Sequence, residues 1–194
     1  NFTLLEKKLP DLCADRIDYA LRDSFATRAD LHRLNRKLSH LIVEEGEFVF
    51  TNVEGAEFFA RDYIEQDQNS WANPRESALY ELLAQAIGHA LDKKLLTLSD
   101  LFTDDETVMR KLQSSGDAYI HKKLAYFTPA FRIEKATRNH YHLFVKTKIR
   151  VVDPKIKDGA SIRRLSEISA RYKKLMEAHV REGQNGWYIN VFKE

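Results

Sequence analysis

Apolar residues recur every third or fourth position through two long stretches of this 194-residue chain. That spacing places them on one side of a helix, because an α-helix turns once every 3.6 residues. One-sided helices of this kind bury their apolar side in a core. The first stripe consists of Ala56, Phe59, Ala60 and Tyr63, and the second of Leu79, Leu82, Leu83, Ala86, Ile87 and Ala90.

Other regions carry the β-branched and aromatic residues that are typical of strands. Residues 41–50 form two short runs around a Glu-Gly turn, which predicts a hairpin. Residues 130–135 and 140–152 predict an antiparallel pair of strands. A long amphipathic helix over 162–180 and a closing strand over 187–192 are expected to follow.

These patterns predict an α+β protein with a mostly helical N-terminal part and a C-terminal part made of a small antiparallel sheet and a long helix. A change of character near Phe127 divides a helical region with a hairpin, 1–126, from a small α+β domain, 127–194. No apolar run approaches the roughly 20 residues of a membrane span. The single cysteine, Cys13, leaves no internal disulfide and fits a reducing compartment, so we expect a cytoplasmic protein.

The charge balance argues against nucleic acid or membrane as partners, because 31 basic and 29 acidic residues leave a net charge of only +2. Lys146, Lys148 and Arg150 would nevertheless share one row of the predicted strand. With basic residues of the following helix they could bind a single-stranded nucleic acid. Acidic residues interspersed along the chain make this the weaker alternative.

The stretch around residues 12–25 separates apolar from charged residues on a helix that could end in the polar residues 24–27. By itself the pattern is typical of a solvated surface helix with an ordinary i,i+4 ion pair. One arc holds Cys13, Ala14, Ile17, Ala20, Leu21 and Phe25, and the opposite arc holds Asp15, Arg16, Asp18, Tyr19, Arg22 and Asp23.

The nine residues 15–23 resemble the last motif of the HD superfamily of metal-dependent phosphohydrolases. That motif reads Asp-(Lys/Arg)-x-Asp-Tyr-x-x-Arg-Asp in the branch that contains the deoxynucleoside triphosphate hydrolases. The resemblance implies that Asp15 is a catalytic metal ligand and that Arg16 contacts the substrate phosphate. It also implies that Tyr19 and Asp23 contact the sugar side of a nucleotide, while Asp18 and Arg22 pair to hold the helix.

Two later segments, 71–74 and 148–154, resemble parts of uncharacterised HD-domain proteins, but the resemblance implies no role for them. The first begins with Trp71, in a loop between the two striped helices. A loop tryptophan can close a ligand pocket or plug the gap between helix ends. The sequence leaves both open.

The chain departs from the family because it has no His before Asp15 and no His-Asp dipeptide, which supply the family's other ligands. A lone carboxylate cannot hold a catalytic divalent metal against water. We therefore expect the C-terminal part of a longer enzyme that uses a divalent metal ion to hydrolyse a phosphorylated small molecule, in particular a nucleotide.

The chain by itself is expected to be inactive and to bind no metal tightly. The alternatives are a non-catalytic binding or oligomerisation module and a weak nucleic-acid-binding domain. Self-association into a homo-oligomer is compatible with each of these hypotheses, and the sequence does not decide it.

Overall fold

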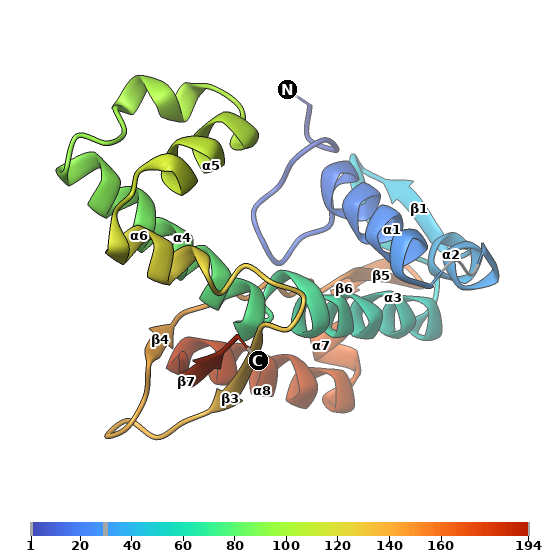
Figure 1. The fold of residues 1–194 in the computed structure, drawn as a ribbon. Helices are drawn as coiled ribbons and strands as arrows, with labels where there is room; N and C mark the ends of the chain where they lie inside the picture. Colours follow the sequence, from blue (N-terminus) through green and yellow to red (C-terminus); the bar gives the residue numbers. More distant parts are fainter. Residues whose placement is uncertain (1, 29–30, 194) are drawn as a thin grey trace. The chain divides into compact units, whose positions relative to one another are not determined.

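The computed structural model describes residues 2–28 and 31–193 and confirms the predicted α+β class. Within these ranges, no helix has both the length and the apolar character needed to cross a bilayer. The contacts group the chain into two compact units, each built from two separate segments (Figure 1). Unit 1 is Asn1–Asn73 with Lys148–Asn185, and unit 2 is Pro74–Thr147 with Gly186–Glu194.

Unit 1 surrounds a four-stranded sheet with the order β1-β2-β5-β6. The predicted hairpin is confirmed as β1 and β2, and Glu45 and Gly46 take positive φ angles of 48° and 75° in its turn. Strand β2 pairs with β5 in parallel, with Val49 opposite Lys155. The elements of unit 1 are α1 (Ala14–Arg28), α2 (Leu31–Leu38), β1 (Leu41–Glu44), β2 (Glu47–Phe50), α3 (Val53–Gln66), the π-helical turn η1 (Asp67–Trp71), β5 (Lys155–Asp158), β6 (Ser161–Arg164), α7 (Leu165–Ile168) and α8 (Ala170–Asn185).

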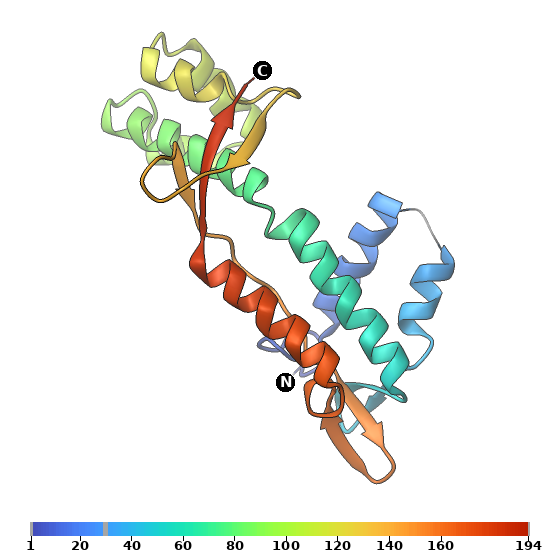
Figure 2. The same ribbon diagram turned by 90° about the horizontal axis from the view of Figure 1, so that it is seen from below.

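Helix α3 is the centre of the unit 1 core. It begins where the Asn52 side chain accepts a hydrogen bond of 2.8 Å from the backbone N–H of Gly55, which satisfies one of the free donors of the first turn. The predicted stripe of this helix is buried and contacts residues of α1, β2, β5 and α8. Helices α3 and α8 run side by side in this core (Figure 2).

Glu47 of β2 ties the N-terminal segment to the sheet. Its carboxylate lies 2.6 Å from the Lys7 ammonium and also accepts a hydrogen bond from Lys155 of β5. These two cations lower the pKa of Glu47 to about 2.

The lowered pKa of Glu47 predicts a pH dependence of stability. A carboxyl group whose pKa falls on folding stabilises the native state above its unfolded pKa, and that contribution is lost as the pH falls through the folded value. We therefore expect Glu47→Gln to weaken the loss of stability between about pH 4.5 and pH 2, as measured by urea unfolding. Equal acid sensitivity of the variant and the unchanged protein would contradict this.

Unit 2 combines helices with a three-stranded sheet of order β3-β7-β4. The second predicted stripe is confirmed in α4: Leu82 is buried under the sheet, and Ala86 and Ala90 are buried against α5 and α6. The other members of the stripe, Leu79, Leu83 and Ile87, are partly buried in the same clusters, and Ala78, which the prediction did not include, is buried as well. The elements are α4 (Pro74–Asp92), the 3₁₀ helix η2 (Leu98–Phe102), α5 (Asp105–Ser114), α6 (Ala118–Leu124), β3 (Arg132–Lys135), β4 (Leu143–Val145) and β7 (Trp187–Phe192).

The predicted pairing of 130–135 with 140–152 is wrong, because the closing strand β7 lies between β3 and β4 and pairs with both. The second run also leaves the sheet at Val145. Beyond it, the backbone N–H of Arg150 donates to the Asp67 carboxylate at 3.0 Å. The basic row proposed for nucleic acid therefore does not lie on a strand.

Two helix boundaries also differ from the prediction. The helix expected over 162–180 begins later, because residues 161–164 form β6 and pair with β5 around Gly159, whose φ is +61°. The helix of residues 12–23 does not end at the polar residues 24–27 but continues to Arg28. The contacts group residues 74–147 with β7, and residues 148–185 with the first 73 residues. The division into domains 1–126 and 127–194 stays a prediction.

Candidate functional site

Helix α1 separates apolar from charged residues, as the sequence predicts. Ile17 and Ala20 are buried in the unit 1 core, as is Cys13 just before the helix. Asp15 and Asp18 are exposed on the other side. The carboxylate predicted to bind metal is therefore accessible on the surface of the described chain.

The apolar arc departs from the prediction at its end. Phe25 is 52% exposed, whereas Ser24 is buried. The reason is that α1 meets a polar part of α3 here: the Ser24 hydroxyl lies 3.4 Å from the Asp62 carboxylate and accepts a hydrogen bond from Gln66. A buried hydroxyl with such partners is well accommodated.

Arg16 is half-buried and contacts the segment that precedes α1. Its guanidinium donates to the carbonyl oxygens of Lys7 and Asp11, at 2.7 Å for the latter, and lies 3.2 Å from the Cys13 sulfur. The resemblance implies that the Arg16 guanidinium contacts the substrate phosphate, but here its N–H groups donate to backbone carbonyl oxygens. A phosphate group would have to compete with these carbonyls for the guanidinium.

Asp15 makes no side-chain hydrogen bond or ion pair that involves the described residues. Asp18 and Arg22 form the predicted ion pair at 2.7 Å, and both side chains are 69% exposed. Such a pair stabilises a helix by a few tenths of a kcal/mol. Among residues 2–28 and 31–193, no three His, Cys, Asp or Glu side chains converge, so the described residues do not fit a divalent metal by themselves.

Tyr19 lies in an aromatic cluster with Tyr63 of α3 and Trp71 of η1. The two phenol groups are hydrogen-bonded to each other. The Trp71 ring meets each tyrosine edge-on, with 5.0 Å between ring centroids in both cases. Edge-to-face contacts of this kind hold aromatic rings in a defined geometry.

Charged side chains lie within electrostatic range of these phenols. Burial raises the pKa of Tyr19 and of Tyr63 above the usual value, and the Arg16 and Arg150 guanidiniums act in the opposite direction. The negative charge of the Asp15 carboxylate also raises the pKa of Tyr19. Both phenols therefore stay protonated at neutral pH. Because they are bonded to each other and Tyr63 is buried, the hydroxyl that can donate to a ligand is that of Tyr19, when it accepts the Tyr63 O–H.

Asp23 contacts the same cluster, because its carboxylate accepts a hydrogen bond of 2.7 Å from the Trp71 indole N–H. The structure thus brings Tyr19 and Asp23 together around Trp71, which the sequence analysis left open between pocket and plug. Tyr63 was assigned only to the core, although its hydroxyl reaches Tyr19. No sequence pattern could relate α1 to residues more than 40 positions away.

A buried hydrogen bond lies at the start of the turn that carries Trp71. Asp67, at the start of η1, is fully buried, and its carboxylate lies 2.8 Å from the imidazole of His179, which is 5% exposed. The Arg150 guanidinium lies 3.7 Å from the other carboxylate oxygen. No local sequence pattern indicates this contact, because the two residues are 112 positions apart.

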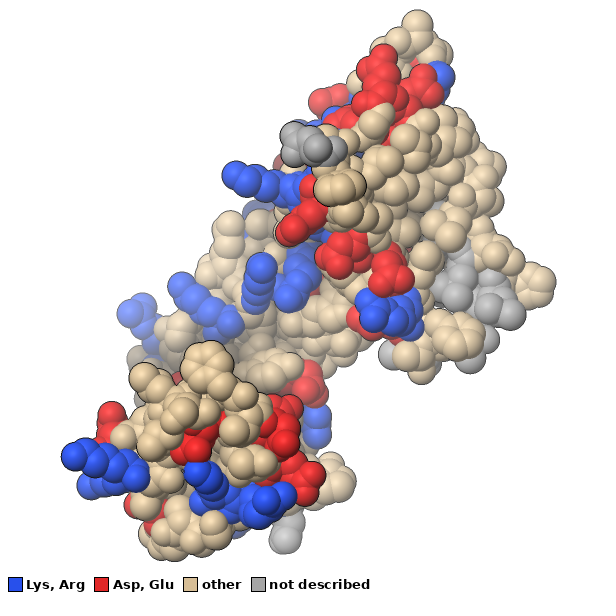
Figure 3. Space-filling view, turned by 90° about the horizontal axis from the view of Figure 1, so that it is seen from above, with Lys and Arg blue, Asp and Glu red and all other residues tan. Residues whose placement is uncertain are grey.

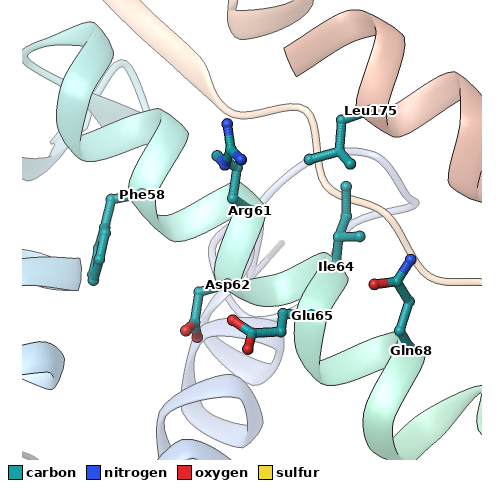
Figure 4. Close-up of a pocket in the computed structure, with 7 residues that line it drawn as sticks. All are labelled: Phe58, Arg61, Asp62, Ile64, Glu65, Gln68 and Leu175. Atoms are coloured by element: carbon teal, nitrogen blue, oxygen red, sulfur yellow. The ribbon is translucent and has the colours of Figure 1, made fainter. Parts of the chain in front are cut away.

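A cavity of about 360 Å³ between α3 and α8 is a separate feature (Figure 4). Acidic and basic side chains both line it, but none of the four predicted site residues does. Its lining consists of Phe58, Arg61, Asp62, Ile64, Glu65, Gln68 and Leu175. The predicted site is thus a surface face of α1 rather than this cavity.

The charges on the face shown in Figure 3 are of both signs. Lys and Arg side chains appear there together with Asp and Glu side chains. This agrees with the small net charge of +2. Any attraction for a phosphorylated ligand must therefore come from individual groups such as Arg16.

Comparison with known proteins gives two similarities. The chain is 32% identical over 196 residues to the uncharacterized protein YdhJ of Bacillus subtilis, covering 100% of this chain and 60% of that protein. It is 34% identical over 112 residues to the metal-dependent phosphohydrolase cns2 of Cordyceps militaris, covering 51% of this chain and 32% of that protein. No protein-family model matches. The chain thus spans less than two thirds of the length of either relative.

Proposed function

We propose that this chain forms the substrate side of an HD-type, metal-dependent phosphohydrolase that acts on a nucleotide or a related phosphoester. The observation that carries the proposal is the arrangement on α1, where the exposed Asp15 and the half-buried Arg16, Tyr19 and Asp23 follow the HD motif. The similarity of half the chain to a protein named a metal-dependent phosphohydrolase supports it.

Asp15 has the exposure and the freedom from other contacts that a metal ligand requires. It cannot act alone, because divalent metal sites need several protein ligands in fixed geometry. We propose that in the complete protein Asp15 is one ligand and that residues outside this chain supply the others. A bound divalent metal would provide Lewis-acid activation of the phosphoryl group.

The remaining three side chains would bind and orient the substrate. Arg16 supplies a guanidinium, which matches the geometry of phosphate oxygens. Tyr19 stays protonated and can donate a hydrogen bond, while the Asp23 carboxylate can accept one from a sugar hydroxyl. Both are held against the ring of Trp71. Because these side chains are already held in place, they lose less conformational entropy when they bind and orient the substrate.

The proposal predicts metal-dependent hydrolysis by the full-length protein. Nucleoside mono- and triphosphates and their deoxy forms would be incubated with Mn²⁺, Mg²⁺ or Ni²⁺, and the release of inorganic phosphate or triphosphate would be measured. We expect turnover of at least one nucleotide and its loss in excess EDTA. The 194-residue chain alone should show none. No turnover of any substrate with any of these metals would refute the proposal.

A further inference from the structure

Trp71 holds two of the proposed substrate-contact residues at once. Its indole N–H donates to the Asp23 carboxylate at 2.7 Å, and its ring lies edge-on to Tyr19 with 5.0 Å between centroids. Asp23 and Tyr19 lie one helical turn apart on α1, so a single side chain contacts both. The tryptophan itself comes from η1, far along the sequence.

The turn that carries Trp71 is firmly anchored. At its start, the fully buried Asp67 bonds to His179 at 2.8 Å and accepts the backbone N–H of Arg150 at 3.0 Å. The neighbouring Tyr63 also packs edge-on to the Trp71 ring, with 5.0 Å between centroids. A side chain supported in this way can set the orientation of its partners.

From these contacts we infer that Trp71 is a positioning residue, which orients the Asp23 carboxylate through the indole N–H and thereby sets the affinity for the sugar of the substrate. The inference rests on the function proposed above. An N–H bonded to a carboxylate is a charge-assisted hydrogen bond, which is stronger than a neutral one. Its loss would remove the restraint that the indole places on one carboxylate oxygen, and so change the orientation in which the carboxylate meets a sugar hydroxyl.

The test uses Trp71→Phe in the full-length protein, because phenylalanine keeps an aromatic ring against Tyr19 and Tyr63 but has no N–H. We expect KM for the deoxynucleotide hydrolysed fastest to rise about tenfold, with kcat changed less than about threefold. The matched control is Trp187→Phe. Among the described residues the Trp187 indole nitrogen has no hydrogen-bond partner, so this variant should keep the original KM.

A double-mutant cycle separates positioning from a general effect on folding. If Trp71 acts through Asp23, then Trp71→Phe should change KM little in a protein that already carries Asp23→Ala. An unchanged KM in the single variant, or full additivity in the double variant, would overturn the inference while leaving hydrolysis intact. Absence of hydrolysis by the unchanged protein would instead refute the proposed function and, with it, the inference.

Discussion

Replacing Asp15 with alanine in the full-length protein is expected to abolish phosphohydrolysis and to leave stability nearly unchanged. Loss of a metal ligand should lower kcat/KM by at least about 1,000-fold, equivalent to about 4 kcal/mol of transition-state stabilisation. Stability should hardly change, because the Asp15 side chain is exposed and forms no hydrogen bond or ion pair with the described residues. Hydrolysis rates and thermal melting of the same preparations measure both effects.

The matched control for this prediction is Asp18→Ala. Asp18 lies on the same exposed side of α1 but pairs with Arg22, and both side chains are 69% exposed. Its removal should cost a few tenths of a kcal/mol in stability and leave turnover unchanged. Turnover retained in Asp15→Ala would remove Asp15 from the metal site. Equal losses in both variants would point to a general effect on the helix.

Local patterns predicted the parts of the fold that depend on neighbouring residues. The stripe of α3 and α4 was sufficient to find both helices and their buried sides, because helical periodicity depends on spacing alone. The Glu45-Gly46 hairpin was found for a similar reason, since its turn requires positive φ angles that glycine adopts readily.

The errors in the strands involve pairing between distant segments. Strand β7 inserts between β3 and β4, and β5 joins β2 in parallel across more than 100 residues, with Val49 opposite Lys155. Residues 161–164 carry a pattern compatible with a helix, yet pairing with β5 makes them a strand. Propensity is a weak guide where such tertiary contacts decide the conformation.

In the candidate site, too, the sequence predicted the local motif but not the contacts between distant segments. The motif on α1 gave Asp15, Arg16, Tyr19 and Asp23 by resemblance, but it gave no indication that Trp71 bonds to Asp23. It also did not reveal that backbone carbonyls bind the Arg16 guanidinium. These contacts arise only when η1 and the N-terminal segment fold against α1.

The largest effect on stability is expected from His179→Ala. Asp67 is fully buried, and its carboxylate would keep only the Arg150 backbone N–H at 3.0 Å and a guanidinium at 3.7 Å. Removing one partner of a buried carboxylate leaves part of its desolvation cost uncompensated, which typically costs about 1–3 kcal/mol and more for charged groups. We expect a loss of about 3 kcal/mol in the free energy of unfolding, measured with urea.

The second substitution Asp67→Asn tests whether the buried charge is the cause. Asparagine keeps the shape of the side chain but is neutral. The double variant should therefore be more stable than His179→Ala alone, or at least lose far less unfolding free energy than the sum of the losses in the two single variants. His121→Ala serves as the control, since His121 is exposed on α6 and should change the unfolding free energy by less than about 0.5 kcal/mol. If His179→Ala were as stable as that control, the Asp67–His179 pair would not hold the turn that carries Trp71. The position of Trp71 would then have to be fixed by its aromatic contacts with Tyr19 and Tyr63.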